Sequence, residues 1–209
     1  MSSADAIHAI WENPLDYDAV RNGPPYLPES GVRSASVDGQ NLFASLCPAY
    51  EGTSLPELGA VLVVLRAAAM MHQTHHWQTR GQSFYGDHLL FERLYNESLG
   101  FIDQVAERAV GASSRMLVCP RIQATQIAAV VQHWSLGQEP DPSAMIGISL
   151  NAETYVLECL KIALSQLDSN GRLSAGTSNL LEGIADKHEE FIYLLQQRLG
   201  GSDDYTYER

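Results

Sequence analysis

The segment spanning residues 75–111 constrains the fold of this chain more than any other part. Its apolar residues recur with the period of a buried amphipathic helix, which we expect over about 84–110. Residues four positions apart share one face of a helix, so side chains at that spacing can act together. Two such pairs of potential metal ligands lie on this helix: His88 with Glu92, and Asp103 with Glu107.

Other segments also have helical periodicity, and none has the alternation of a strand. One long helix should begin near Ser54–Pro56, with Ser54 as its cap, and a shorter helix should begin at Pro120. A third long helix is expected over about 150–167, and a fourth from Asn179, which forms a capping-box pattern with Glu182. The sequence therefore predicts an all-α four-helix bundle with a short extra helix between the second and third long helices.

The two ligand pairs are too far apart on one helix to bind the same metal ion. Glu92 and Asp103 are eleven residues apart, which keeps them on one stripe but separates them by ~16 Å along the axis. Metal–ligand bonds are only about 2 Å long. One chain should therefore carry two half-sites, and an antiparallel two-fold neighbour would complete two sites at once.

His76 precedes this helix and falls on the apolar stripe of the first long helix, so we assign it to the half-site of His88. The five candidate ligands are then two imidazoles and three carboxylates, a set that suits iron or zinc better than copper. His72 and His188 are secondary candidates, although a histidine on an apolar stripe is more often a core residue than a ligand.

The spacing of these residues resembles that of the Dps miniferritins, the DNA-protection-during-starvation proteins. The matching pattern is HW, a short Gly-containing loop, H-x3-E, ten residues and D-x3-E-R. The long connection between the second and third helices resembles the ferritin-like topology, and the short helix within it resembles the Dps variant. One departure is Glu92, where the family more often has Asp.

The resemblance implies a twelve-subunit hollow shell with dinuclear ferroxidase sites at its dimer interfaces. Such a protein oxidises Fe(II), preferably with hydrogen peroxide or else with O2, stores ferric iron and limits oxidative damage. The catalytic and metal-binding residues would be His76, His88, Glu92, Asp103 and Glu107. Asp168 and Glu182, near the turn between the last two helices, would line an ion-entry pore.

Two alternative functions stay open: a nucleoid protein that compacts DNA, and a shell with a structural zinc site and no turnover. The formal net charge of −12 disfavours direct binding to nucleic acid or to an anionic membrane. Residues 1–54 form an acidic, Pro-containing N-terminal extension, for which Trp11, Tyr17 and Tyr26 are candidate anchors. The bundle should occupy 55–200, and residues 201–209 should form an acidic tail.

The same sequence features predict a cytoplasmic protein. The N-terminal residues contain no basic and apolar signal pattern, and the most apolar run, about 58–71, contains Arg66 and is too short for a membrane span. The three cysteines, Cys47, Cys119 and Cys159, form no C-x-x-C pair, which suggests ordinary thiols in a reducing compartment.

Overall fold

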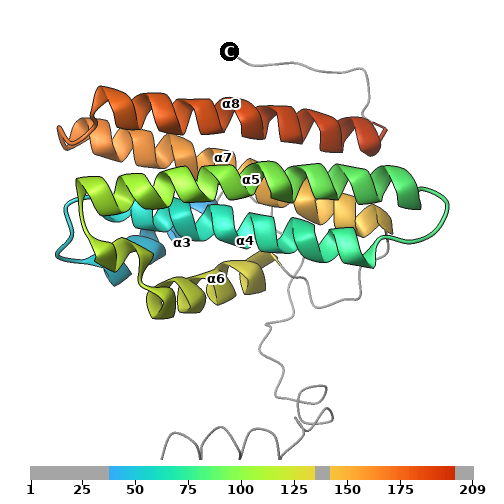
Figure 1. Cartoon of the computed structure of the whole chain (residues 1–209), viewed down its shortest axis with the longest axis horizontal. Helices are drawn as coiled ribbons and strands as arrows, with labels where there is room; N and C mark the ends of the chain where they lie inside the picture. The colour runs from blue at the N-terminus through green and yellow to red at the C-terminus, as the bar shows by residue number, and fades with distance from the viewer. Residues whose placement is uncertain (1–37, 135–141, 201–209) are drawn as a thin grey trace, which may run out of the picture. The chain divides into compact units, whose positions relative to one another are not determined.

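A computed structural model describes residues 38–134 and 142–200. The bundle predicted from the sequence is confirmed, since the described residues form helices and contain no strand (Figure 1). The long helices are α4 (Pro56–Gln78), α5 (Phe84–Ala112), α7 (Pro142–Ser169) and α8 (Ala175–Arg198). The shorter elements are α3 (Asp38–Leu46), η1 (Cys47–Tyr50), η2 (Arg115–Val118) and α6 (Pro120–Trp134).

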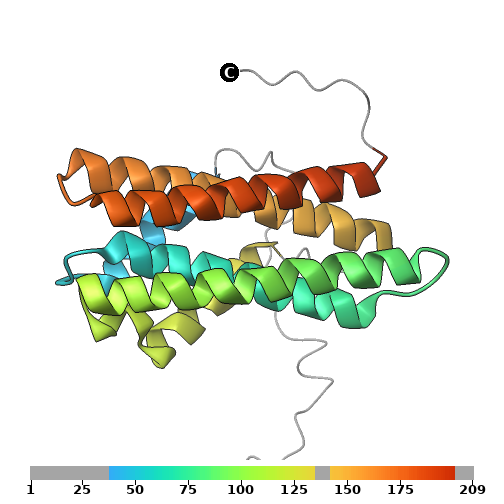
Figure 2. The ribbon, with the colours of Figure 1, turned by 45° about the horizontal axis from the view of Figure 1, so that its top comes forward.

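The long helices pack as two hairpins. Helix α4 contacts α5 and α7, while α8 contacts α7 and α5, so the order around the bundle is α4, α5, α8, α7 (Figure 2). The connection from α5 to α7 contains η2 and the short helix α6, which packs on α4. This is the position that the sequence predicted for the extra helix.

Three details of the predicted helix ends are wrong. Helix α7 begins at Pro142 rather than near residue 150, because the buried Met145 and Ile146 extend its apolar face through a segment rich in turn-forming residues. Helix α8 begins at Ala175, where the Ser174 hydroxyl accepts a hydrogen bond from the amide of Thr177. The expected capping box at Asn179 is therefore absent.

Ser54 does not cap α4 either. The N-cap residue is Leu55, which makes no capping hydrogen bond through its side chain, and the Ser54 hydroxyl donates to Ser113 instead. Pro56 does lie in the first turn, as expected. Part of the segment expected to form the N-terminal extension is helical, as α3, whereas the aromatic anchors of the extension and the tail 201–209 lie outside the described residues.

The apolar core consists of two clusters with polar side chains between them. Ile146 of α7 and Phe191 of α8 belong to the smaller cluster. Val156 of α7 and Ile184 of α8 belong to the larger one. The residues between these positions include Ser149, Glu153 and His188, all with 0% exposure. A polar layer thus crosses the centre of the bundle.

Helix α3 and η1, which belong to the segment expected to form an extension, add Phe43, Leu46 and Tyr50 to the larger cluster. The Tyr50 hydroxyl accepts a hydrogen bond from the buried Gln123 amide of α6, at 2.7 Å. The Tyr50 ring lies over Gly59 of α4, where a Cβ atom would come within 2.7 Å of the ring. Only glycine leaves room for this contact.

We therefore predict that Gly59→Ala destabilises the protein, although alanine is the better helix former by about 1 kcal/mol. The added methyl group must displace Tyr50, and overpacking of this kind costs roughly 1–3 kcal/mol. Gly183→Ala is the matched control, because a Cβ atom at this helical position meets nothing within 4 Å. Thermal unfolding followed by circular dichroism should show a lower Tm for Gly59→Ala only, and equal shifts in the two variants would contradict this account.

Candidate metal centre

His76 and His88 face each other across the turn between α4 and α5. His76 lies in the last turn of α4 and His88 in the first turns of α5, and their rings stack with centroids 3.7 Å apart. Gly81, with φ of 86°, reverses the chain between the two helices in a conformation that favours glycine. The structure thus brings together the two histidines that the sequence assigned to one half-site.

Reciprocal hydrogen bonds fix the orientation of these two rings. The Nδ1 atom of each ring lies 3.0 Å from the backbone carbonyl oxygen of the other residue. A carbonyl oxygen only accepts, so Nδ1 of each ring must carry the hydrogen. In the neutral imidazole the lone pair is then on Nε2, which is the state required of a histidine that binds a metal through Nε2.

The carboxylates of the predicted site occupy two separate places on α5. Glu92 is half-buried one turn after His88, whereas Asp103 and Glu107 are exposed much further along the helix. Glu107 lines a surface cavity of about 500 Å³ together with Gln104 and Arg108. Because α5 runs without a break from Phe84 to Ala112, His88 and Glu107 are ~28 Å apart along its axis.

Within residues 38–134 and 142–200, no three His, Cys, Asp or Glu side chains are grouped so that they could hold a metal ion. Completion of the site by a second chain stays a prediction. The pore role of Asp168 and Glu182 also stays a prediction: both residues are exposed, and the Glu182 carboxylate accepts a hydrogen bond from Ser178.

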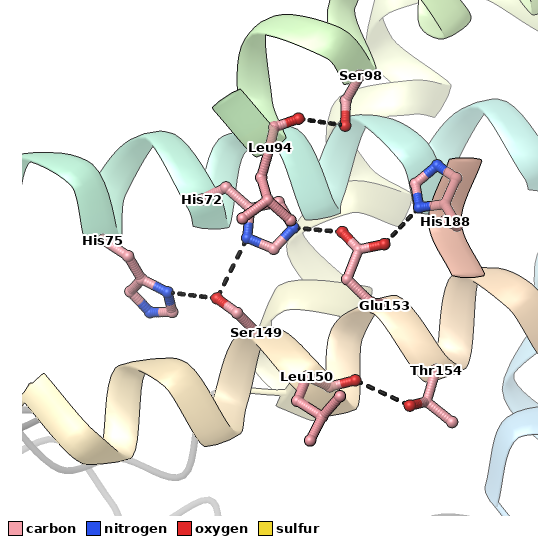
Figure 3. Close-up of polar contacts among 9 residues, drawn as sticks. All are labelled: His72, His75, Leu94, Ser98, Ser149, Leu150, Glu153, Thr154 and His188. Carbon is pink, nitrogen blue, oxygen red and sulfur yellow. Dashed lines mark hydrogen bonds and ion pairs between the residues drawn. The ribbon is translucent and has the colours of Figure 1, made fainter. Parts of the chain in front are cut away.

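The secondary candidates His72 and His188 lie in the polar layer and share one buried carboxylate, that of Glu153 (Figure 3). His72 Nε2 lies 2.5 Å from Glu153 Oε1, and His188 Nδ1 bonds to Glu153 Oε2. These nitrogens point at a carboxylate rather than at a common centre. A role for either histidine as a secondary metal ligand stays a prediction.

Ser149 extends the network toward the end of α4. Its hydroxyl lies 3.1 Å from Nδ1 of His72 and 2.8 Å from Nδ1 of His75 (Figure 3). Burial, and secondarily the neighbouring His72, lower the pKa of His75 to about 4, so this imidazole is neutral at pH 7. The network therefore connects α4, α7 and α8 without an Arg or Lys side chain.

Sequence reasoning missed Glu153 and Ser149. A signal for Glu153 was present, because it occupies a position on the apolar stripe of its helix between Leu150 and Leu157. A carboxylate at such a position needs a buried partner, and two unassigned histidines on apolar stripes were available. Ser149 offers no comparable signal, since a buried serine is common in helices.

Comparisons with known proteins were made on the sequence and on the fold, and no protein-family model matches the chain. It is 26% identical over 152 residues to the DNA protection during starvation protein of Brevibacillus brevis, which covers 69% of this chain and 96% of that protein. It is 27% identical over 126 residues to general stress protein 20U of Bacillus subtilis, covering 60% of this chain and 83% of that one.

Solved Dps structures share the fold. Dps from Thermosynechococcus elongatus superposes with a TM-score of 0.58 at 18% identity, covering 81% of this chain and 99% of that structure. An archaeal Dps homologue from Halobacterium salinarum gives a TM-score of 0.60 at 15% identity, covering 90% and 98%. The resemblance to the Dps family is confirmed. The four-helix bundle therefore has the ferritin-like fold of these structures. Among the described residues, none of the helices combines the length and the apolar character that a membrane span needs.

The state of Glu153 leads to a prediction about acid stability. Burial opposes ionisation of this carboxyl group, but the charges and hydrogen bonds of His188 and His72 outweigh it and lower the pKa of Glu153 from 4.5 to about 2. A folded-state pKa below the unfolded value stabilises the protein above pH 4.5, and this contribution is lost as the pH falls from 4.5 toward 2. The ionised Glu153 side chain contributes on the order of 3 kcal/mol to the free energy of unfolding above this pH range.

The native protein and Glu153→Gln differ in their free energy of unfolding, and we call this difference the stability gap. We therefore expect the gap to narrow as the pH falls from 4.5 toward 2. Urea unfolding at pH 6, 4.5, 3.5 and 2.5 measures the gap directly, because the other carboxylates titrate alike in both proteins. A gap that stays constant from pH 4.5 to 2.5 would show that Glu153 is not ionised in the folded state.

Proposed function

We propose that this protein is a miniferritin that oxidises Fe(II) at dinuclear sites between two-fold-related subunits and stores the ferric product in a hollow shell. The observation that carries the proposal is the His76–His88 pair, whose Nδ1 atoms are both committed to backbone carbonyls. The Nε2 lone pairs of both rings are thereby left to bind metal, with Glu92 one turn away as an oxygen donor. The similarity to Dps proteins in sequence and fold supports the same assignment.

The reaction follows from the ligand set. Carboxylate oxygens favour Fe(III) over Fe(II), so binding at Glu92, Asp103 and Glu107 would promote loss of an electron. Two Fe(II) ions held close together each lose one electron, and together they reduce one hydrogen peroxide molecule to two hydroxide ions. Iron is the substrate here, and zinc, which suits the same ligands, would compete with it.

Exposed apolar side chains support a second copy as the partner. Met70 and Trp77 of α4 are 45% and 68% exposed, and Leu89 and Leu99 of α5 are 43% and 52% exposed. At 100° per residue, both leucines lie on the stripe of α5 that carries the candidate ligands. Clustered apolar side chains on a surface mark protein interfaces, and an antiparallel copy would cover them while joining the half-sites. The number twelve for the shell comes from the family.

The charge distribution favours this function over direct DNA binding. The formal net charge is −12, and Arg93, Arg172, Lys187 and Arg198 each form an ion pair with a carboxylate of the same chain. A duplex phosphate backbone is bound mainly through unpaired Lys and Arg side chains. A cytoplasmic location is part of the proposal and rests on the sequence features alone.

Single variants test the site itself. His88→Ala and Glu107→Ala should each slow Fe(II) oxidation at least tenfold, because each removes one ligand from every site. Both should leave the assembly intact by size-exclusion chromatography, since the apolar contacts remain. Near-ultraviolet absorbance after adding Fe(II) and peroxide gives the rate. Native rates in both variants would place the reaction elsewhere, and zinc binding without any turnover in the native protein would indicate a structural zinc site.

Co-assembly of the two variants tests whether each metal site is formed by residues of two different chains. In a dimer of His88→Ala with Glu107→Ala, one site loses both contributions and the other keeps a native His half and a native acid half. Random pairing then makes about a quarter of all sites intact, so the co-expressed mixture should recover roughly a quarter of the native rate. Sites built within one chain would give no recovery, because every chain would carry a defect.

DNA binding provides a separate test. With most surface charge negative, the native protein should not shift duplex DNA in a gel at physiological salt and without divalent metal. A fusion that adds a Lys-rich arm at the N-terminus should bind, and its affinity should fall steeply as salt rises. Salt-sensitive binding by the native protein would instead support the nucleoid function.

A further inference from the structure

The last turns of α4 carry histidines on two sides. His76 faces α5 and stacks on His88, whereas His72 and His75 face α7 and bond to the hydroxyl of Ser149. The buried network of Glu153, His72, Ser149 and His75 therefore ends on the residue that directly precedes the proposed iron ligand (Figure 3). All four side chains are at least 95% buried.

The hydrogen bonds of this network form one continuous series from Glu153 to His75. An ionised carboxylate only accepts, so His72 must present Nε2–H to it. This bond sets the orientation of the His72 ring, whose Nδ1 atom lies 3.1 Å from the hydroxyl of Ser149. The same hydroxyl lies 2.8 Å from Nδ1 of His75. Glu153 is thereby connected, through His72 and Ser149, to the last turns of α4.

We propose that Glu153 is a positioning residue for the metal site, acting through His72 and Ser149 on the C-terminal turn of α4. This inference rests on the proposed function, because it concerns the same His76. Helix ends fray where backbone partners run out, and α4 ends at Gln78, two residues after His76. The bonds to Ser149 fasten this last turn to α7, and the backbone carbonyl of His75 also accepts the amide of Thr79.

The placement of His76 depends on this fastening. Its Nδ1 atom bonds to the carbonyl of His88, and the carbonyl of His76 accepts Nδ1–H of His88, so both rings require the end of α4 in one register against α5. A metal site tolerates displacements of only about 0.5 Å in its ligands. A looser last turn should therefore weaken metal binding before it unfolds the bundle.

The test compares two buried serines. Ser149→Ala removes the hydroxyl that joins His72 to His75, whereas Ser98→Ala removes an equally buried hydroxyl that bonds only to the carbonyl of Leu94 (Figure 3). Both should lower Tm. Only Ser149→Ala should weaken Zn(II) binding to the assembled full-length protein, by about tenfold as for other residues that support a metal ligand. Titration calorimetry with Zn(II) alone gives the affinity without any turnover.

Glu153→Gln provides a second variant of unchanged shape. The amide has one accepting oxygen and one donating nitrogen, so it cannot accept from both His72 and His188, and one of these two hydrogen bonds is lost. Fe(II) oxidation should then show an apparent KM raised several-fold with kcat within twofold of native, the pattern of weakened ground-state binding. The number of Zn(II) ions bound per chain should be unchanged.

The outcomes separate the two proposals. If the native protein neither binds Zn(II) nor oxidises Fe(II), the proposed function fails. If it does both while Ser149→Ala matches Ser98→Ala and Glu153→Gln keeps the native KM, the positioning role alone is overturned. Loss of one bound Zn(II) per chain in Glu153→Gln would also overturn it, because the carboxylate would then be a ligand of its own site.

Discussion

The unbroken length of α5 is the constraint on which the architecture of the candidate site depends. A helix of 29 residues holds His88 and Glu92 near its start and Asp103 and Glu107 near its end, and no rotamer change can close that distance. Under the proposed function, neither half-site can hold the metal ions alone, and metal chemistry becomes a property of the assembly. Because a two-fold contact is isologous, one interface completes two sites. Under the proposed function, the same stretch of helix therefore serves both iron oxidation and subunit association.

The polar layer between the two apolar clusters has a cost in folding free energy. A buried ion pair is seldom worth more than the apolar contacts that could replace it. Here a single carboxylate is bonded by imidazoles from α4 and α8, so Glu153 of α7 connects three of the four long helices. Hydrogen bonds of this kind are directional, whereas Leu and Val contacts tolerate sliding. The layer therefore restrains the register of the helices. Within it, Nε2 of His188 is buried and has no hydrogen-bond partner among the described residues.

Sequence reasoning predicted the parts of this fold that depend on periodicity. The bounds of α5 follow from its apolar stripe and are met within two residues, and His76 and His88 meet because a short Gly-containing turn joins two antiparallel helices. Helix ends were harder to predict from the sequence. Ser174 rather than Asn179 caps α8, and which residue does so depends on where the turn after α7 ends. The partners of His72 and His188 were beyond reach, because the relative rotation of α4, α7 and α8 is decided by packing over the whole bundle. The acids of α5 are placed by sequence, and their completion by histidines of a second chain stays a prediction.

The buried carboxylates among the described residues all have a partner within the chain, unlike the exposed acids of the candidate site. Glu57 and Asp87 are buried and paired with Arg172 and Arg198, which pin the ends of the bundle. Glu153 is buried with histidines. Asp103 and Glu107, in the part of the chain that the structure describes, form no ion pair, although Arg108 is adjacent in sequence. Asp103 and Glu107 are thus exposed and unpaired on the stripe of α5 that also carries the exposed Leu89 and Leu99. The proposed function requires this of ligands that bind a cation together with a second subunit.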